Sequence, residues 1–145
     1  MIAATVLAAG VAALAPGPNL RVAALDTQAR AASPGELRLP TTIRNSGNRR
    51  AGASRTRFAL SRDRALGGDV RLASMPEARL RAGRSRTTTA LLRVPAGLKG
   101  GAWYVIACAD ARSAVRERNE HDNCRAARDA IAVVPQTLPE VPPLP

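Results

Sequence analysis

The chain has 145 residues, which is enough for one domain of ordinary size, and a formal net charge of +11 in which Lys99 is the single lysine. Aromatic residues make up 2% of the chain, so the core holds few large side chains and the surface lacks the interleaved aromatics of a single-strand nucleic-acid binder. No basic run reaches the length of a nucleic-acid patch. The positive charge has two alternative explanations, an arginine-rich coding bias or an anionic partner.

The first 15 residues resemble a secretory signal segment. Residues 2–14 are an unbroken run of apolar or small residues, too few for a membrane-spanning helix, which needs about 20. Ala13-Leu14-Ala15, at the end of this run, has the small residues of a cleavage site. We therefore expect residues 1–15 to be a signal-peptide-like segment, and we expect no transmembrane anchor. A buried apolar strand or helix is the alternative.

From residue 18 to residue 134 the sequence has the pattern of an all-β domain. Short apolar or alternating runs are separated by clusters of Gly, Pro, Asn and Asp, and no segment keeps a helical period. The predicted strands are residues 20–25, 36–45, 55–61, 70–75, 86–94, 102–109 and 124–134. Two of them alternate most clearly, with predicted inner-face residues Leu37, Leu39, Thr41 and Ile43 in one and Thr88, Ala90, Leu92 and Val94 in the other.

About seven short strands of this kind predict an immunoglobulin-like antiparallel β-sandwich. Residues 135–145 contain five prolines, so we expect an extended, proline-rich tail after the sandwich.

Several short motifs, in order along the chain, resemble the CARDB domain, the cell-adhesion-related domain found in bacteria. They are Pro18-Asn19-Leu20, Ile43-Arg44-Asn45-Ser46-Gly47, Arg57-Phe58-Ala59-Leu60-Ser61, Gly68-Asp69-Val70, Val94-Pro95-Ala96-Gly97, and Ala107-Cys108-Ala109-Asp110 with Val115, Glu117, Asn119-Glu120 and Asp122-Asn123-Cys124. The resemblance covers residues 18–134. It implies an immunoglobulin-like, non-catalytic module used for adhesion, display or spacing on secreted, cell-envelope or periplasmic proteins.

Cys108 and Cys124 are the only cysteines, and they flank one polar loop between two predicted strands. In an exported protein this arrangement favours a disulfide. A zinc site is the weaker alternative, because zinc takes four N or S ligands and only His121 is available besides the two thiols. His121 itself is expected to be solvated.

The loop of residues 110–123 is rich in oxygen donors. The candidate calcium ligands are Asp110, Glu117, Glu120 and Asp122, with Asn119 and Asn123 beside them. The alternative is that these side chains cap turns and accept hydrogen bonds from loop amides. Arginines at positions 112, 116 and 118 compete for the same carboxylates.

Trp103 and Tyr104 are adjacent on a predicted strand, so one belongs to the core and the other is a possible partner contact. No catalytic motif is present, whether G-x-S-x-G, P-loop or H-E-x-x-H. We expect no cofactor, with calcium at the acidic loop as the alternative. We therefore expect a non-catalytic secreted or cell-surface module for binding, adhesion or structure, with an unidentified protein or an anionic envelope polymer as partner. The alternative is general polyanion or nucleic-acid binding through the arginine-rich surface, without specific recognition of nucleic acid.

Overall fold

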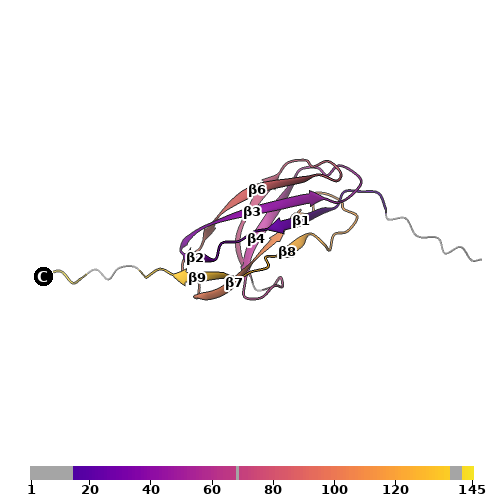
Figure 1. Ribbon diagram of the computed structural model, residues 1–145. Helices are drawn as coiled ribbons and strands as arrows, with labels where there is room; N and C mark the ends of the chain where they lie inside the picture. The colour runs from indigo at the N-terminus through magenta and orange to yellow at the C-terminus, as the bar shows by residue number, and fades with distance from the viewer. Residues whose placement is uncertain (1–14, 68, 138–141) are drawn as a thin grey trace, which may run out of the picture.

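Nine strands form two sheets that pack face to face in a computed structural model (Figure 1). The structure describes residues 15–67, 69–137 and 142–145. The strands are β1 (Leu20–Leu25), β2 (Arg30–Ser33), β3 (Gly35–Asn45), β4 (Ser54–Ser61), β5 (Val70–Glu77), β6 (Ser85–Val94), β7 (Gly101–Cys108), β8 (Cys124–Ala126) and β9 (Ile131–Pro135). Residues 1–14 of the signal-like segment and residues 138–141 of the proline-rich tail lie outside the described residues.

The smaller sheet has the order β1-β3-β6, and both of its strand pairs are antiparallel. The central strand, β3, alternates as predicted, with Leu37, Leu39, Thr41 and Ile43 all buried. On β6 the residues from Ala90 onward follow the prediction, whereas Thr88, expected on the inner face, is exposed. The buried part of β6 therefore begins at Ala90.

The larger sheet has the order β2-β9-β7-β4-β5, and β8 pairs with β7 as well. The first part of β7 pairs with β9 and its last part, from Ile106 to Cys108, pairs with β8. The single strand predicted at residues 124–134 is thus two strands along the same edge of β7. The exposed residues Arg128 and Asp129 lie in the interruption between them.

The sequence did not predict β2, which pairs with β9 in parallel, while the other strand pairs are antiparallel. This short strand carries only two buried side chains, Ala31 and Ser33. Such a weak alternation gives no signal for a partner that lies about a hundred residues further along the chain. The strand count therefore rises above seven, and the predicted β-sandwich is confirmed.

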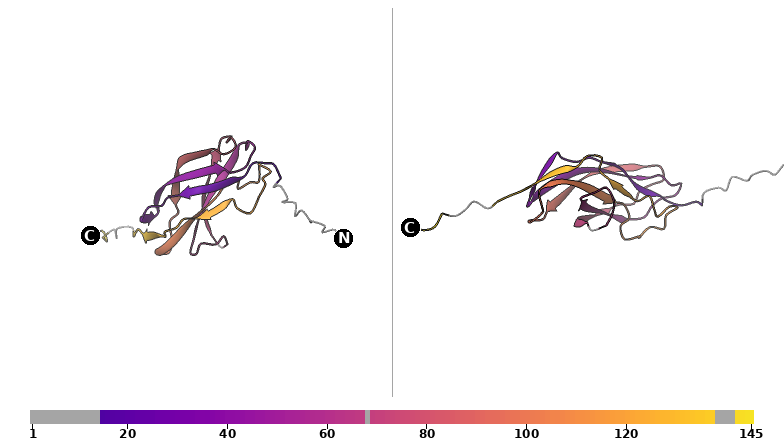
Figure 2. Two further views of the ribbon diagram at one scale, coloured as in Figure 1. Left: turned by 45° about the vertical axis from the view of Figure 1, so that its right-hand side comes forward. Right: turned by 90° about the horizontal axis from the view of Figure 1, so that it is seen from below.

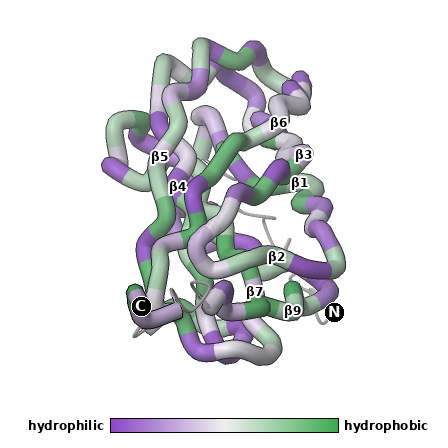
Figure 3. Tube along the Cα trace, turned by 90° about the vertical axis from the view of Figure 1, so that its left-hand side faces the viewer, coloured by the Kyte–Doolittle hydropathy of each residue, from purple (hydrophilic) through white to green (hydrophobic). Residues whose placement is uncertain are grey.

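The core lies between the two sheets. Its largest fully buried side chains include Phe58 and Leu60 from β4, which lies beside β5 (Figure 3), together with Leu37 and Leu39 from β3 and Leu92 from β6. The sandwich is elongated, with the indigo start of the described chain near one end and β9 near the other (Figures 1 and 2). Within the described residues, no helix is long and apolar enough to cross a membrane.

Candidate functional site

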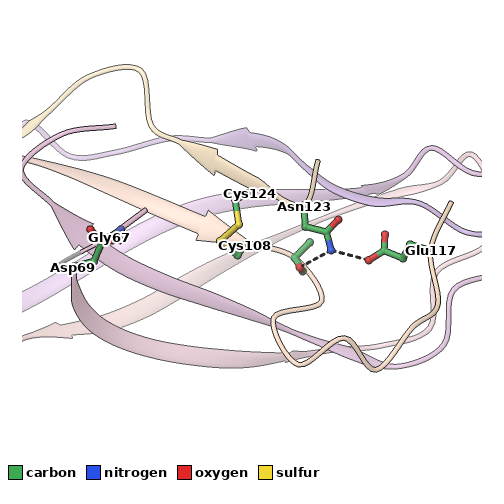
Figure 4. Close-up of a disulfide and its surroundings, with 7 residues drawn as sticks. Gly67, Asp69, Cys108, Glu117, Asn123 and Cys124 are labelled. Carbon is green, nitrogen blue, oxygen red and sulfur yellow. Dashed lines mark hydrogen bonds between the residues drawn. A yellow bond between two sulfur atoms is a disulfide. The ribbon is translucent and has the colours of Figure 1, made fainter. Parts of the chain in front are cut away.

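The predicted disulfide joins the end of β7 to the start of β8 (Figure 4). Cys108 and Cys124 stand directly opposite each other in the antiparallel pairing of these strands, and they form the bond across a separation of 16 residues. Both cysteines lie at or next to the ends of strands that the sequence predicted, residues 102–109 and 124–134, so their pairing could be predicted as well. The bond closes the base of the loop that carries the acidic residues.

Asp110 organises the first turn of that loop. Its backbone has a positive φ of 45°, and its side chain is 2% exposed. Its two carboxylate oxygens accept hydrogen bonds from the backbone N–H groups of Ala114, at 2.8 Å, and Val115, at 3.0 Å. This is the turn chemistry that Asp side chains favour. The loop backbone is therefore fixed by an internal cap.

Glu117 connects the loop to the rest of the sandwich. Its Oε1 accepts a hydrogen bond from Asn123 Nδ2 at 2.7 Å (Figure 4), and its Oε2 accepts one from the backbone N–H of Leu20, at the start of β1. Burial raises the pKa of the Glu117 carboxyl to about 7, although both hydrogen bonds lower it. The nearby carboxylates of Asp110 and Glu120 raise this pKa further. The loop thus holds a carboxyl group whose negative charge is poorly solvated.

Three of the four predicted calcium ligands come together. One oxygen each from Asp110, Glu117 and Glu120 lies within 4.8 Å of the others. Asp122 is directed elsewhere, because its Oδ2 accepts a hydrogen bond from Asn19 Nδ2 at 2.9 Å. The fold therefore brings Asn19 to this loop, which the sequence could not indicate because 103 residues separate it from Asp122.

Three side-chain oxygens, two in this loop and one on Asn19, which contacts the loop, are buried without a donor from the described residues. Among the described residues, nothing donates a hydrogen bond to the Oδ1 atoms of Asn19, Asp122 and Asn123. Buried oxygens normally have a partner. His121 has no part in the arrangement; it is exposed, and its backbone N–H donates to Asn119 Oδ1.

The two adjacent aromatic residues are placed on opposite faces of β7. Trp103 is buried in the core, with its Nε1 donating to the backbone oxygen of Lys99, and Tyr104 is half-buried. The guanidinium of Arg62 lies 4.1 Å from the Trp103 ring centroid, and that of Arg64 lies 5.1 Å from the Tyr104 ring centroid. Of the two, Tyr104 is the one that a partner could reach.

Comparison with known proteins gives one family and several similar folds. The model of the CARDB family matches residues 17–127. A CARDB domain from Pyrococcus furiosus, crystallised in complex with di-metal ions, has a TM-score of 0.61 and 16% identity over 83% of this chain and 96% of that domain. A domain of a predicted cell-surface protein from Methanosarcina acetivorans has a TM-score of 0.56 and 15% identity, over 81% of this chain and 92% of that domain.

A β-glucosidase from Erythrobacter marinus is also similar, with a TM-score of 0.51 and 14% identity. The match covers 81% of this chain but only 16% of the glucosidase, so it concerns the fold of a small part of that enzyme. No curated protein matches the chain in sequence.

Proposed function

Because this chain belongs to the CARDB family, we propose that it is a non-catalytic module of an exported protein, which binds or spaces other components at the cell surface or in the envelope. Similarity to a domain of a predicted cell-surface protein supports this location. The elongated sandwich supports a spacing role, since the chain enters near one end and β9 leaves at the other (Figure 1).

The disulfide is the observation that carries the proposal. Both cysteines of the chain are used in it, and it joins neighbouring strands. Structural disulfides persist in oxidising compartments and are rare where thiols are kept reduced. A module with this bond is therefore suited to the cell envelope or the extracellular medium.

The redox state of the cysteines in cells tests the proposed location. Cells of the native host are quenched in acid, fractionated, and treated with a thiol-reactive polyethylene glycol reagent before and after reduction. We expect the protein in the envelope fraction or the medium, with Cys108 and Cys124 reacting only after reduction. Free thiols on protein recovered from the cytoplasm would contradict the proposal.

A second candidate function is cation binding by the acidic loop, and the clustering of Asp110, Glu117 and Glu120 favours it. Carboxylate and amide oxygens are the donors that calcium prefers. A cation would also stabilise the Glu117 carboxylate, whose pKa is raised to about 7 mainly by burial. Asn123 donates through Nδ2 to Glu117, and its Oδ1, buried without a donor from the described residues, is a further potential ligand.

Calcium titration of protein dialysed against a chelator tests this second function. We expect heat of binding and a higher Tm, because a ligand that binds only the folded state stabilises it. Glu120→Gln should weaken calcium binding about tenfold, since it removes one charge while keeping an oxygen that can accept from the Glu117 N–H. Glu36→Gln, on the exposed face of β3, is the matched control and should bind calcium as the unmodified protein does. No heat and no Tm change at millimolar calcium would leave the carboxylates as loop caps only.

A further inference from the structure

Four arginine side chains surround one cavity on the outer face of β4 and β5. The cavity has a volume of about 240 Å³, and Arg55, Arg57, Arg71 and Arg112 line it together with the small residues Ala73 and Ala111. No acidic residue lines it. The alanines leave room between the longer side chains, so the cavity is both open and strongly positive.

The strand register explains how these arginines meet. Arg55 and Arg57 are two residues apart on β4, so their side chains point to the same face, opposite to the buried Phe58. On β5, Arg71 stands opposite Ala59, one diagonal position from Arg57. The backbone N–H of Ala111 donates to the backbone oxygen of Arg55 at 2.8 Å, which holds the turn that carries Arg112 against β4.

None of these four arginines forms an ion pair with a described residue. Across the described residues the single ion pair joins Arg38 to Glu36, both outside this cavity. Arg55 donates to the Oγ of Ser74 at 3.1 Å and to its backbone oxygen at 3.0 Å, which fixes its position. The side chains of Arg57, Arg71 and Arg112 make no hydrogen bond with any described residue, so their donors are available to a ligand.

A second cavity adjoins the first and shares Arg57 and Arg71 with it. Its volume is about 210 Å³, and its other lining residues include Ala59, Leu66 and Asp69. Asp69 accepts a hydrogen bond from the Gly67 N–H through Oδ2, whereas its buried Oδ1 has no donor among the described residues. This cavity therefore combines apolar surface with an acceptor and two donors, as a hydroxylated ligand requires.

We infer that the two cavities together bind a phosphorylated or sulfated saccharide unit of an envelope polymer. Its tetrahedral oxyanion lies among Arg55, Arg57, Arg71 and Arg112, because guanidinium groups form paired hydrogen bonds with such anions. Its sugar ring lies in the second cavity, with a hydroxyl group donating to Asp69. The inference rests on the proposed function, since an exported module is what meets such polymers.

Isothermal titration of the purified full chain tests the site with four probes: sulfated, phosphorylated and neutral dextran, and oligo-dT. The site variant is Arg57→Gln/Arg71→Gln. The control is Arg21→Gln/Arg44→Gln, an exposed, directly opposed pair on the other sheet, which removes the same charge. We expect both charged dextrans to bind and the neutral one not to bind. The site variant should lose at least about tenfold in affinity and the control less than about threefold.

Salt dependence gives a second measurement. Removing two phosphate or sulfate contacts should lower the slope of log affinity against log salt by about two. Arg112→Gln, in a turn outside the strands, should weaken binding about threefold. This variant tests the site even if the double variant on the strands misfolds. Equal losses in the site and control variants would overturn the site in favour of general attraction. Binding of oligo-dT as tight as that of the charged dextrans, with the same loss in the site variant, would overturn the saccharide assignment.

This titration and the proposed function can fail separately. Binding without export would contradict the exported location and leave the site standing. Export without binding would contradict only the site.

Discussion

The side chain of Asn45 makes four hydrogen bonds to the backbone of other segments. It is fully buried, and its Oδ1 accepts from the backbone N–H groups of Asn19 and Gly47, both at 3.0 Å. Its Nδ2 donates to the backbone oxygens of Arg49, at 2.8 Å, and Leu80, at 3.0 Å. A Cβ on Gly47 would overlap the backbone of the segment that precedes β1, so glycine is needed there. One amide and one glycine thus hold the start of β1 against the end of β3.

Asn45→Asp tests this connection with almost no change of shape. The new carboxylate oxygen would face two backbone oxygens in place of the donating amide, and it would be buried without a partner. We expect a loss of about 3 kcal/mol or more in the free energy of unfolding, measured by urea denaturation. Asn48→Asp is the matched control, because Asn48 is exposed and uses only its Oδ1, which accepts from the Gly17 N–H. Similar losses in the two variants would contradict the role given to Asn45.

Glu117 makes stability depend on pH. Burial raises its pKa from 4.5 to about 7 in the folded protein, so between these values the folded state holds a proton that the unfolded chain has released. The stabilising contribution of that proton is fully present below the unfolded value and is lost as pH rises through about 7. Because the side chain remains partly solvated, the decrease should stay well below about 1.4 kcal/mol per pH unit.

Urea denaturation in chelator at pH 5 and at pH 8 measures this effect. We expect the unmodified protein to be less stable at pH 8, and the difference to shrink in Glu117→Gln. The glutamine side chain has one acceptor oxygen for two donors, so this variant should be less stable at both pH values; only the difference between them is diagnostic. Equal pH dependence in both proteins would exclude Glu117 as its origin.

At the scale of the strands, Pro40 shows how β3 accepts a residue that cannot donate. Its backbone oxygen accepts from the Asp26 N–H at 3.1 Å, just after the last β1–β3 pair, Leu25 with Thr41. In an antiparallel ladder the N–H and C=O of one residue point to the same side. The missing donor of Pro40 therefore faces the side where β1 has ended, and the pairing of β3 with β6 continues past it.

The disulfide between Cys108 and Cys124 stabilises the junction of β7 and β8. Replacing both cysteines by alanine should lower the free energy of unfolding by about 3 kcal/mol, the chain-entropy value for a loop of this length. Urea denaturation of the oxidised protein, the reduced protein and the double variant measures it. The reduced protein and the variant should agree, and a loss below about 1 kcal/mol would contradict a main role for the bond in stability.

Strands with a clear period of two could be predicted from the sequence, and β3, from Gly35 to Asn45, is the best example. Hydrophobic alternation did not predict the strands whose existence depends on pairing with a distant part of the chain. Nothing local indicates that Arg30–Ser33 pairs with β9, or that the strand after Cys124 is interrupted. The same division holds for the sites: the loop acids were found as a run of oxygen donors, whereas Asn19 and the cavity arginines meet only through long-range register.

At the scale of the whole molecule, positive charge dominates the surface. The formal net charge is +11, and the described residues contain one ion pair, Arg38 with Glu36, on exposed side chains. An exposed pair of this kind contributes little stability. Repulsion between like charges therefore acts against the folded state at low salt.

Salt should consequently stabilise the protein. The Debye length falls from about 30 Å at 0.01 M to about 8 Å at 0.15 M ionic strength, so sodium chloride screens the repulsion and should raise Tm. Sodium sulfate at equal ionic strength should raise it further, partly by general exclusion from the surface and partly by binding among the arginines. Arg57→Gln/Arg71→Gln should lose the second part, whereas Arg21→Gln/Arg44→Gln should keep it. A Tm that falls on addition of sodium chloride would mean that attraction between opposite charges outweighs the repulsion, despite the net charge of +11.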